Sequence, residues 1–239
     1  MGEVVELWIY LASTPLFGLT ATLLAYVAAQ ALYERLGQPP WASPVLWSVI
    51  AIGAVLLLTG TPYPTYFAGA QFVHVLLGPA IVALAWPLWQ RRAELRSRGA
   101  ALLVAAFIGG AAAALSAIVL ARLAGLPESV VMSLAPKSVT APVAMGIADR
   151  VGGIPALAAV FAVLTGVIGA LSGKSLFDRL GLSDWRIRGF ALGTVAHGIG
   201  TARAIQVNAD AGAYAGLALC LQVLIASLLM PWVLPLLAR

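Results

Sequence analysis

The sequence predicts an all-α integral membrane protein with about seven transmembrane helices, one re-entrant hairpin and discontinuous helices. Hydrophobic residues make up 62% of the 239 residues and charged residues only 10%, which is more apolar than a soluble domain of this length requires. The apolar residues occur in runs of about the 20 residues that cross a bilayer, and the basic residues lie mostly between these runs. We therefore expect residues 1–239 to form one polytopic membrane domain.

Seven apolar runs are predicted to be the transmembrane helices. They are Leu7–Tyr33, Val45–Thr59, Tyr66–Trp89, Ala101–Leu123, Ile154–Leu171, Phe190–Val207 and Tyr214–Leu237. The first run follows Glu3 and Glu6 rather than a basic region, so it is expected to stay in the mature protein rather than to be removed as a secretory signal.

Residues Glu128–Val151 are less apolar than the runs around them and contain Pro136 and Pro142. Each proline removes a backbone donor and frees an earlier carbonyl. Broken backbone at membrane depth is tolerated only where it is buried in protein or lines a polar cavity. This stretch is therefore predicted to enter the membrane and return on the same side. Further breaks are expected at Gly78, Pro79, Gly198 and Gly200.

Loop charges predict the orientation in a bacterial cytoplasmic membrane. Two basic clusters are expected to be cytoplasmic: Arg91, Arg92, Arg96 and Arg98 after the third run, and Lys174, Arg179, Arg186 and Arg188 after the fifth. This assignment places the N-terminus outside and the C-terminal Arg239 in the cytoplasm, and it requires residues 126–153 to begin and end outside. The cytoplasmic placement of these basic residues also explains the net charge of +5. No nucleic-acid partner is therefore expected.

Three basic or titratable groups fall inside the apolar parts of the chain, whereas every acidic residue lies near a segment end or in a loop. Lys137 lies in the middle of the predicted hairpin, and His197 and Arg203 lie inside Phe190–Val207. A charge at the bilayer centre costs roughly 2.5–3.5 kcal/mol on insertion scales, so it persists only with a partner or a function. Because no carboxylate is obviously available to pair with Lys137 and Arg203, the sequence predicts a carboxylate-bearing substrate.

The predicted site lies between the hairpin and Phe190–Val207. Lys137 and Arg203 are expected to neutralise the carboxylate, and Ser138, Thr140, His197 and Thr201 to bind its oxo or hydroxyl groups. If Pro142 opens a half-helix, the helix N-terminus adds free N–H groups. Imidazole titrates near neutral pH, so His74 or His197 would serve as a proton relay.

Each of these groups also has a purely structural interpretation. Arg203 would reach the membrane–water interface or pair with Asp210, and Lys137 would pair with Asp149. The histidines His74 and His197 would only pack or hydrogen-bond the backbone. Nothing supports ordinary enzyme chemistry, because the chain shows no nucleophile elbow, metal-ligand cluster or P-loop. No cofactor or metal is expected, and the single Cys220 excludes a disulfide framework.

At these motifs the chain resembles the LrgB/CidB family of membrane proteins. The resemblance rests on residues 132–142 (MSLAPKSVTAP), residues 196–203 (AHGIGTAR) and residues 76–88 (LLGPAIVALAWPL), and on Gly152, Gly153, Thr165, Gly166, Gly169, Gly189 and Gly193 between them. It covers the chain from about Val45 onward, and Ala135 and Ala141 depart mildly from the family pattern.

The resemblance implies two competing functions. One is an antiholin-like regulator of murein hydrolase export and cell lysis, which acts with a small holin-like partner of the LrgA/CidA kind. The other is a carrier of small carboxylates, since relatives are linked to pyruvate and a plastid relative exchanges glycolate and glycerate. Buried cations favour the carrier, so we expect a transporter of monocarboxylates of the pyruvate, lactate, glycolate or glycerate type. A channel is a third alternative. Further copies of the chain are expected as partners in a homo-oligomer.

Overall fold

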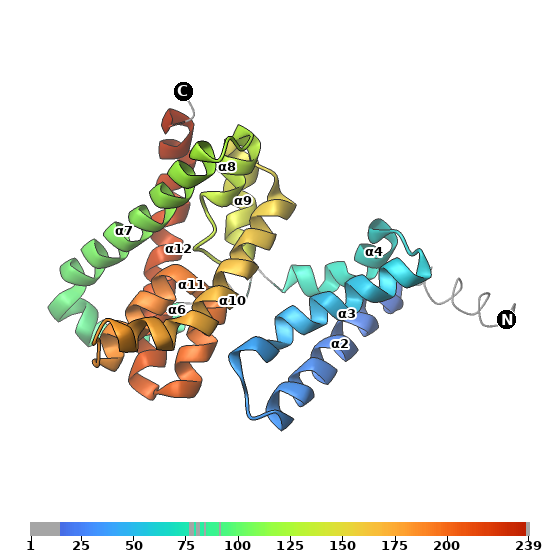
Figure 1. The fold of residues 1–239 in the computed structure, drawn as a ribbon, viewed down its shortest axis with the longest axis horizontal. Coiled ribbons are helices and arrows are strands. Elements are labelled where there is room, and N and C mark those ends of the chain that lie inside the picture. Colours follow the sequence, from blue (N-terminus) through green and yellow to red (C-terminus); the bar gives the residue numbers. More distant parts are fainter. Residues whose placement is uncertain (1–14, 77–78, 80–81, 84, 91, 238–239) are drawn as a thin grey trace, which may run out of the picture. The chain divides into compact units, whose positions relative to one another are not determined.

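The computed structural model describes residues 15–76, 79, 82–83, 85–90 and 92–237, and the regular structure in these residues is entirely helical (Figure 1). The prediction of an all-α protein is therefore confirmed. The chain forms two compact units, residues 1–82 and residues 83–239.

The first unit contains α2 (Pro15–Arg35), the short 3-10 helix η1 (Pro40–Ala42), α3 (Pro44–Thr59) and α4 (Tyr63–Val75). Helix α2 packs against both α3 and α4. The hydroxyl groups of Thr22 in α2 and Tyr66 in α4 are hydrogen-bonded at 2.7 Å. Helix α3 ends at Gly60, whose φ of 63° is the left-handed conformation common at helix C-termini.

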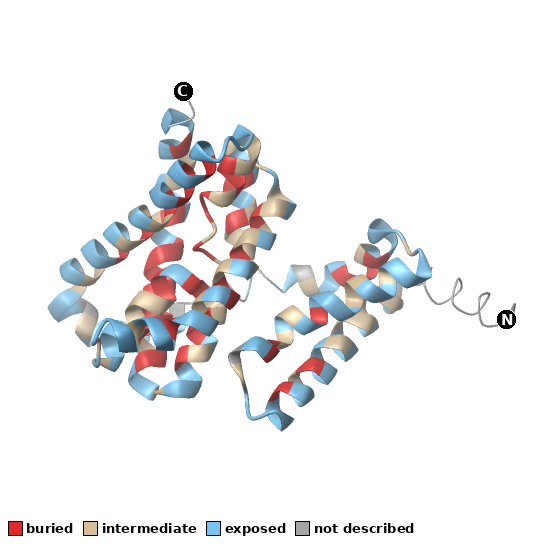
Figure 2. Cartoon of the chain, viewed as in Figure 1, coloured by how far each residue is buried: buried red, intermediate tan, exposed pale blue. Residues whose placement is uncertain are grey.

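The second unit contains seven described helices. They are α6 (Ala85–Gln90), α7 (Arg92–Leu123), α8 (Glu128–Leu134), α9 (Ala141–Val151), α10 (Pro155–Arg179), α11 (Trp185–Val207) and α12 (Ala209–Leu237). Buried residues concentrate along α11, α12 and the stretch from α8 to α9 (Figure 2). The largest core cluster is rich in alanine and joins α7, α8, α9, α10 and α12, because small side chains let membrane helices approach closely.

Four helices are long and apolar enough to cross a membrane, namely α2, α7, α10 and α12, and α3 is a shorter apolar helix. They correspond to four of the seven predicted spans. The third predicted span, Tyr66–Trp89, is described only as α4 and α6, because most residues between them, Gly78 included, lie outside the described residues. The outward side chains of the long helices are apolar and exposed, as at Leu120, Ile168 and Leu228, which fits contact with lipid.

The sixth predicted span differs most from expectation, because α11 doubles back on itself at His197. That residue has φ 40° and ψ −133°, which are not helical values. A methyl group on Gly189, near the start of α11, would lie 2.1 Å from the carbonyl oxygen of Ala211, just after the end of α11. A straight helix of 23 residues would separate its ends by roughly 34 Å. Residues 185–196 and 198–207 are therefore the two arms of a helical hairpin, which we call hairpin 2.

Residues 128–151 have the helix–break–helix form predicted for them. The break between α8 and α9 spans residues 135–140, and Pro142 occupies the first turn of α9. The far end of this hairpin returns to α8, since the Ile154 N–H donates to the Ser133 hydroxyl at 2.7 Å. We call it hairpin 1.

The C-terminal end of α12 lies beside the C-terminal end of α7. Arg122 donates to the carbonyl oxygen of Leu237 at 2.7 Å and to the carboxylate of Glu128 at 2.6 Å. At the other end of the unit, Tyr214 near the start of α12 lines a cavity with Arg98 and Arg186. Helices α7 and α12 thus run in the same direction, and α12 ends far from the basic residues at the start of α7.

Candidate functional site

Three separate elements converge on a single turn of α7, residues Gly109–Ala113, which we call the α7 turn. From hairpin 1, Lys137 Nζ donates to the carbonyl oxygen of Ala113 at 3.0 Å. From hairpin 2, the methyl group of Thr194 lies 3.1 Å from where a side chain would begin on Gly109. From α12, the side-chain amide of Gln222 lies directly over Gly110. The tips of both hairpins therefore meet α7 near the middle of its length.

Lys137 occupies this site without a charged partner among the described residues. It is half-buried between the buried residues Pro136 and Ser138, and its second hydrogen bond goes to the Ser138 hydroxyl at 3.4 Å. Among the residues that the structure describes, no salt bridge joins Lys137 to a carboxylate, and Asp149, the alternative partner, is exposed. The two oxygen atoms that hold the ammonium group are neutral, so its charge is not balanced by these contacts.

The two hydroxyl groups beside Lys137 differ in their hydrogen bonding. Ser138 is 3% exposed and accepts the bond from Lys137. The Thr140 hydroxyl oxygen is buried and has no hydrogen-bond partner in the described part of the chain. Thr140 immediately precedes α9 but its side chain does not cap that helix. Such an unpaired buried hydroxyl costs free energy unless a ligand or water completes it.

His197 and Thr201 are satisfied within the protein. His197 is 4% exposed, and its Nε2 donates to the carbonyl oxygen of Ala162 in α10 at 2.7 Å. The Thr201 hydroxyl donates back to the carbonyl oxygen of His197 at 2.8 Å. These bonds fix the tip of hairpin 2 against α10. They match the interpretation in which His197 hydrogen-bonds the backbone.

Arg203 lies in a different neighbourhood from Lys137. It lines a cavity together with Lys174, Arg188 and the aromatic side chains of Phe177 and Trp185. The sequence predicted that Lys137 and Arg203 would share one carboxylate. The reversal of α11 at His197 instead carries Arg203 back to the basic end of α10. We call this cavity the basic cavity.

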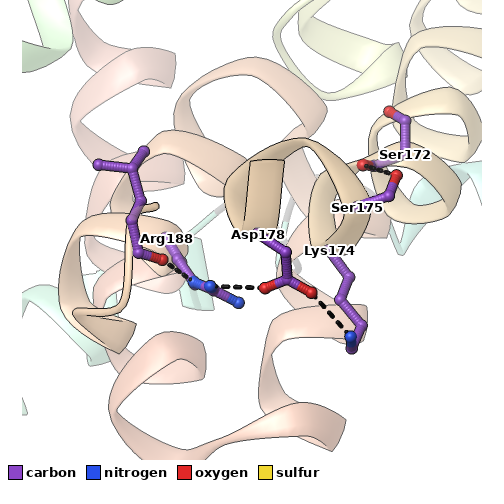
Figure 3. A network of polar contacts seen from close by, with 6 residues as sticks. Ser172, Lys174, Ser175, Asp178 and Arg188 are labelled. Carbon is purple, nitrogen blue, oxygen red and sulfur yellow. Dashed lines mark hydrogen bonds and ion pairs between the residues drawn. The ribbon is translucent and has the colours of Figure 1, made fainter. Parts of the chain in front are cut away.

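Two of the basic residues around that cavity, Lys174 and Arg188, are held by one carboxylate, Asp178. It accepts from Lys174 at 2.8 Å and from Arg188 at 2.6 Å (Figure 3). Arg188 also donates to the carbonyl oxygen of Leu182, and its guanidinium lies 5.0 Å from the centre of the Trp185 ring, within cation–π range. The end of α10 is thereby fixed against the start of α11.

Helix α11 begins at an N-cap supplied by Asp184. Its carboxylate accepts from the backbone N–H of Arg186 at 2.8 Å and from the Arg186 guanidinium at 3.0 Å. These bonds stabilise the ionised carboxylate and lower the pKa of Asp184. The first arm of hairpin 2 therefore starts from a fixed position.

The remaining predicted residues fall into two groups. Pro136, Pro142, Gly198 and Gly200 lie at the two hairpin breaks or in the helical turns that follow them. Gly78 lies outside the described residues, and Pro79 stands between residues that are not described. The backbone of His74 belongs to α4 in the first unit, but its side chain is not described.

Gln222 is not among the residues predicted from the sequence. It is 1% exposed, and its side-chain oxygen has no hydrogen-bond partner among the residues that the structure describes. The available signal was a single amide between Leu221 and Val223 in the middle of a long apolar run. An uncharged residue does not stand out in a search for buried charges.

Comparison with known proteins identifies the family. Residues 22–236 match the LrgB-like family. The chain belongs to this family. The LrgB-like protein is 32% identical over 200 residues to the uncharacterized protein YwbG of Bacillus subtilis, covering 84% of this chain and 88% of the relative. It is 35% identical over 186 residues to an uncharacterized protein of Haemophilus influenzae, covering 78% and 80% of the two chains.

The LrgB-like chain is also 28% identical over 211 residues to the holin-like protein CidB of Staphylococcus aureus, covering 88% of this chain and 91% of the relative. These bacterial relatives and the long apolar helices together identify a multi-pass membrane protein. No solved structure matches the chain significantly.

Proposed function

We propose that this LrgB-like protein carries small monocarboxylates of the pyruvate, lactate, glycolate or glycerate type across the bacterial cytoplasmic membrane. The observation that supports this most is the ammonium group of Lys137, half-buried at the break of hairpin 1 and held by the neutral oxygen atoms of Ala113 and Ser138. A carboxylate would supply the missing negative charge.

The substrate carboxylate would bind Lys137 at the α7 turn. The unpaired hydroxyl of Thr140 and the hydroxyl of Ser138 would bind its remaining oxygen atoms. Arg203, with Lys174 and Arg188 in the basic cavity, would attract the anion from the side on which α10 ends, because clustered positive charge raises the local concentration of anions. His197 and Thr201 would keep the tip of hairpin 2 in place. Transport of the substrate would be coupled to the movement of a proton through His74 or His197.

The arrangement of the second unit supports a membrane orientation with two re-entrant hairpins. If the basic residues at the starts of α7 and α11 are cytoplasmic, hairpin 1 enters from outside and hairpin 2 from the cytoplasm. Helix α12 then ends outside, because Leu237 lies beside Arg122 at the far end of α7. We therefore replace the predicted cytoplasmic C-terminus with an external one, since the reversal at His197 removes one crossing.

Uptake of labelled glycolate and pyruvate into proteoliposomes tests the carrier. Lys137→Met should lower uptake roughly 10- to 100-fold, since a hydrogen bond to a charged group contributes about 1.5–3 kcal/mol. Arg150→Met is the matched control, because Arg150 is an exposed cation on the same hairpin, and it should transport normally. A carrier also saturates and exchanges substrate across the membrane, whereas a channel does neither. Uptake that is unchanged in Lys137→Met would overturn the proposal.

The name of the staphylococcal relatives, holin-like protein CidB, favours a second candidate function. On this alternative the chain is an antiholin-like regulator of murein hydrolase export and cell lysis that acts with a small LrgA/CidA-like membrane protein or with further copies of itself. Its effect on lysis would survive Lys137→Ala and Arg203→Ala. Measuring lysis and uptake in the same variants separates the two functions.

A further inference from the structure

Gln222 brings an unsatisfied polar group into the same region of the bundle as Lys137. Its amide is 1% exposed, its oxygen has no partner in the structure, and α12 is otherwise apolar around it. A buried amide without hydrogen bonds costs free energy. A glutamine that served only to join α7 and α12 would be expected to bond across the helix interface, so the unpaired oxygen calls for a different partner.

The position of Gln222 relative to Lys137 follows from the α7 turn. The amide of Gln222 lies over Gly110, where an added methyl group would be 2.2 Å from Nε2 and 2.5 Å from Oε1. Lys137 binds the carbonyl oxygen of Ala113, three residues further along α7. Residues three apart lie on the same helix face, about 5–6 Å from one another. Lys137 and Gln222 therefore contact α7 at positions less than one helical turn apart.

A cavity lies beside Gln222. It has a volume of about 230 Å³ and lies between α7 and α12, with Gly110 and Gln222 among its lining residues. The other lining residues, such as Phe107, Ile118 and Leu234, are apolar. Gln222 is thus the polar group that this cavity presents to a small molecule.

We infer that Gln222 binds the 2-hydroxy group of the transported acid and selects 2-hydroxy acids over unsubstituted carboxylates. This inference rests on the proposed carrier function. The side-chain oxygen of Gln222 accepts hydrogen bonds, and a 2-hydroxy group donates one. Acetate or propionate would leave the buried amide unpaired, and a site built to hydrogen-bond a substrate group rejects analogues that lack it.

Competition between paired acids in proteoliposomes tests the inference. Labelled glycolate uptake is challenged with unlabelled glycolate or acetate, and labelled lactate uptake with lactate or propionate. The wild type should prefer the hydroxy acid roughly tenfold or more. Gln222→Met should lose most of that preference while still carrying acetate, because Lys137 remains. Leu221→Met is the control, since Leu221 is buried beside Gln222 and the change nearly conserves volume.

The outcomes separate this inference from the carrier proposal. A wild-type protein that moves no carboxylate overturns both. A wild type that transports carboxylates without preference, or a Gln222→Met variant with full preference, overturns only the role of Gln222. If Gln222→Met fails to yield folded protein by size exclusion, Gln222→Asn replaces it, because it withdraws the amide by one methylene. That variant should also lose preference, and unchanged preference there overturns the inference.

Discussion

Gly189 in the first arm of hairpin 2 lies in contact with the backbone of Ala211 in α12, and Gly193 repeats the contact one turn later with Ala215. The four-residue step on both sides means that this arm runs alongside α12 in the same direction. The chain between them must therefore reverse twice, once at His197 and once at Asn208, between α11 and α12. This contact turns a segment long enough to cross the membrane into a hairpin.

Side chains at these glycines should disrupt the packing of hairpin 2. A methyl group at Gly189 or Gly193 would lie 2.1 Å from the carbonyl oxygen of Ala211 or Ala215. Overpacking of this kind costs about 1–3 kcal/mol. Gly189→Ala and Gly193→Ala should therefore lower the thermal unfolding temperature in detergent micelles. Gly146→Ala is the control, because nothing lies within 4 Å of an added methyl group there. Equal stability of all three variants would argue against the packing described.

His197 should tolerate glycine better than alanine. Its φ of 40° lies in a region that side chains disfavour, at a cost of about 1–3 kcal/mol. Both substitutions lose the hydrogen bond to Ala162, but glycine also removes the backbone strain. His197→Gly should thus unfold at a higher temperature than His197→Ala. Inside an ordinary helix alanine is the more stabilising residue by about 1 kcal/mol, so the opposite order would show that α11 is not broken at this position.

Cysteine labelling should place both ends of α11 on the same side of the membrane. In a Cys220→Ala background, Ser183→Cys before α11 and Ala209→Cys after it should react with an impermeant thiol reagent added to one side. Leu126→Cys, between α7 and α8, should react only from the other side. All three positions are exposed. Labelling of Ser183→Cys and Ala209→Cys from opposite sides would restore the straight crossing and the cytoplasmic C-terminus.

The parts of the fold that depend on local sequence could be predicted from it. Helices α7, α10 and α12 follow from apolar length, because a bilayer requires about 20 such residues. The break of hairpin 1 follows from Pro136 and Pro142, which cannot continue a helix without losing a hydrogen bond. Lys137 could be predicted as a candidate site residue, because a charged residue between apolar segments is conspicuous in the sequence.

The reversal of α11 could not be predicted in the same way. Gly193, Gly198 and Gly200 indicate close packing or unwinding, but they do not specify the direction in which the chain leaves the break. The residue with positive φ at this break is His197, whereas local preference would select one of the neighbouring glycines. Tertiary contacts with Ala211 and Ala215 decide the outcome, and they join residues about twenty positions apart. The separation of Arg203 from Lys137 is a direct consequence.

Chemical rescue at Lys137 tests the central claim that a positive charge at the α7 turn binds the substrate. In the Cys220→Ala background, Lys137→Cys should abolish most glycolate uptake. A reagent that adds an aminoethyl group to the thiol would restore an ammonium at this position and should recover uptake, whereas a reagent that adds a neutral methyl group should not. Full uptake by unmodified Lys137→Cys, or equal recovery with the neutral reagent, would contradict the account.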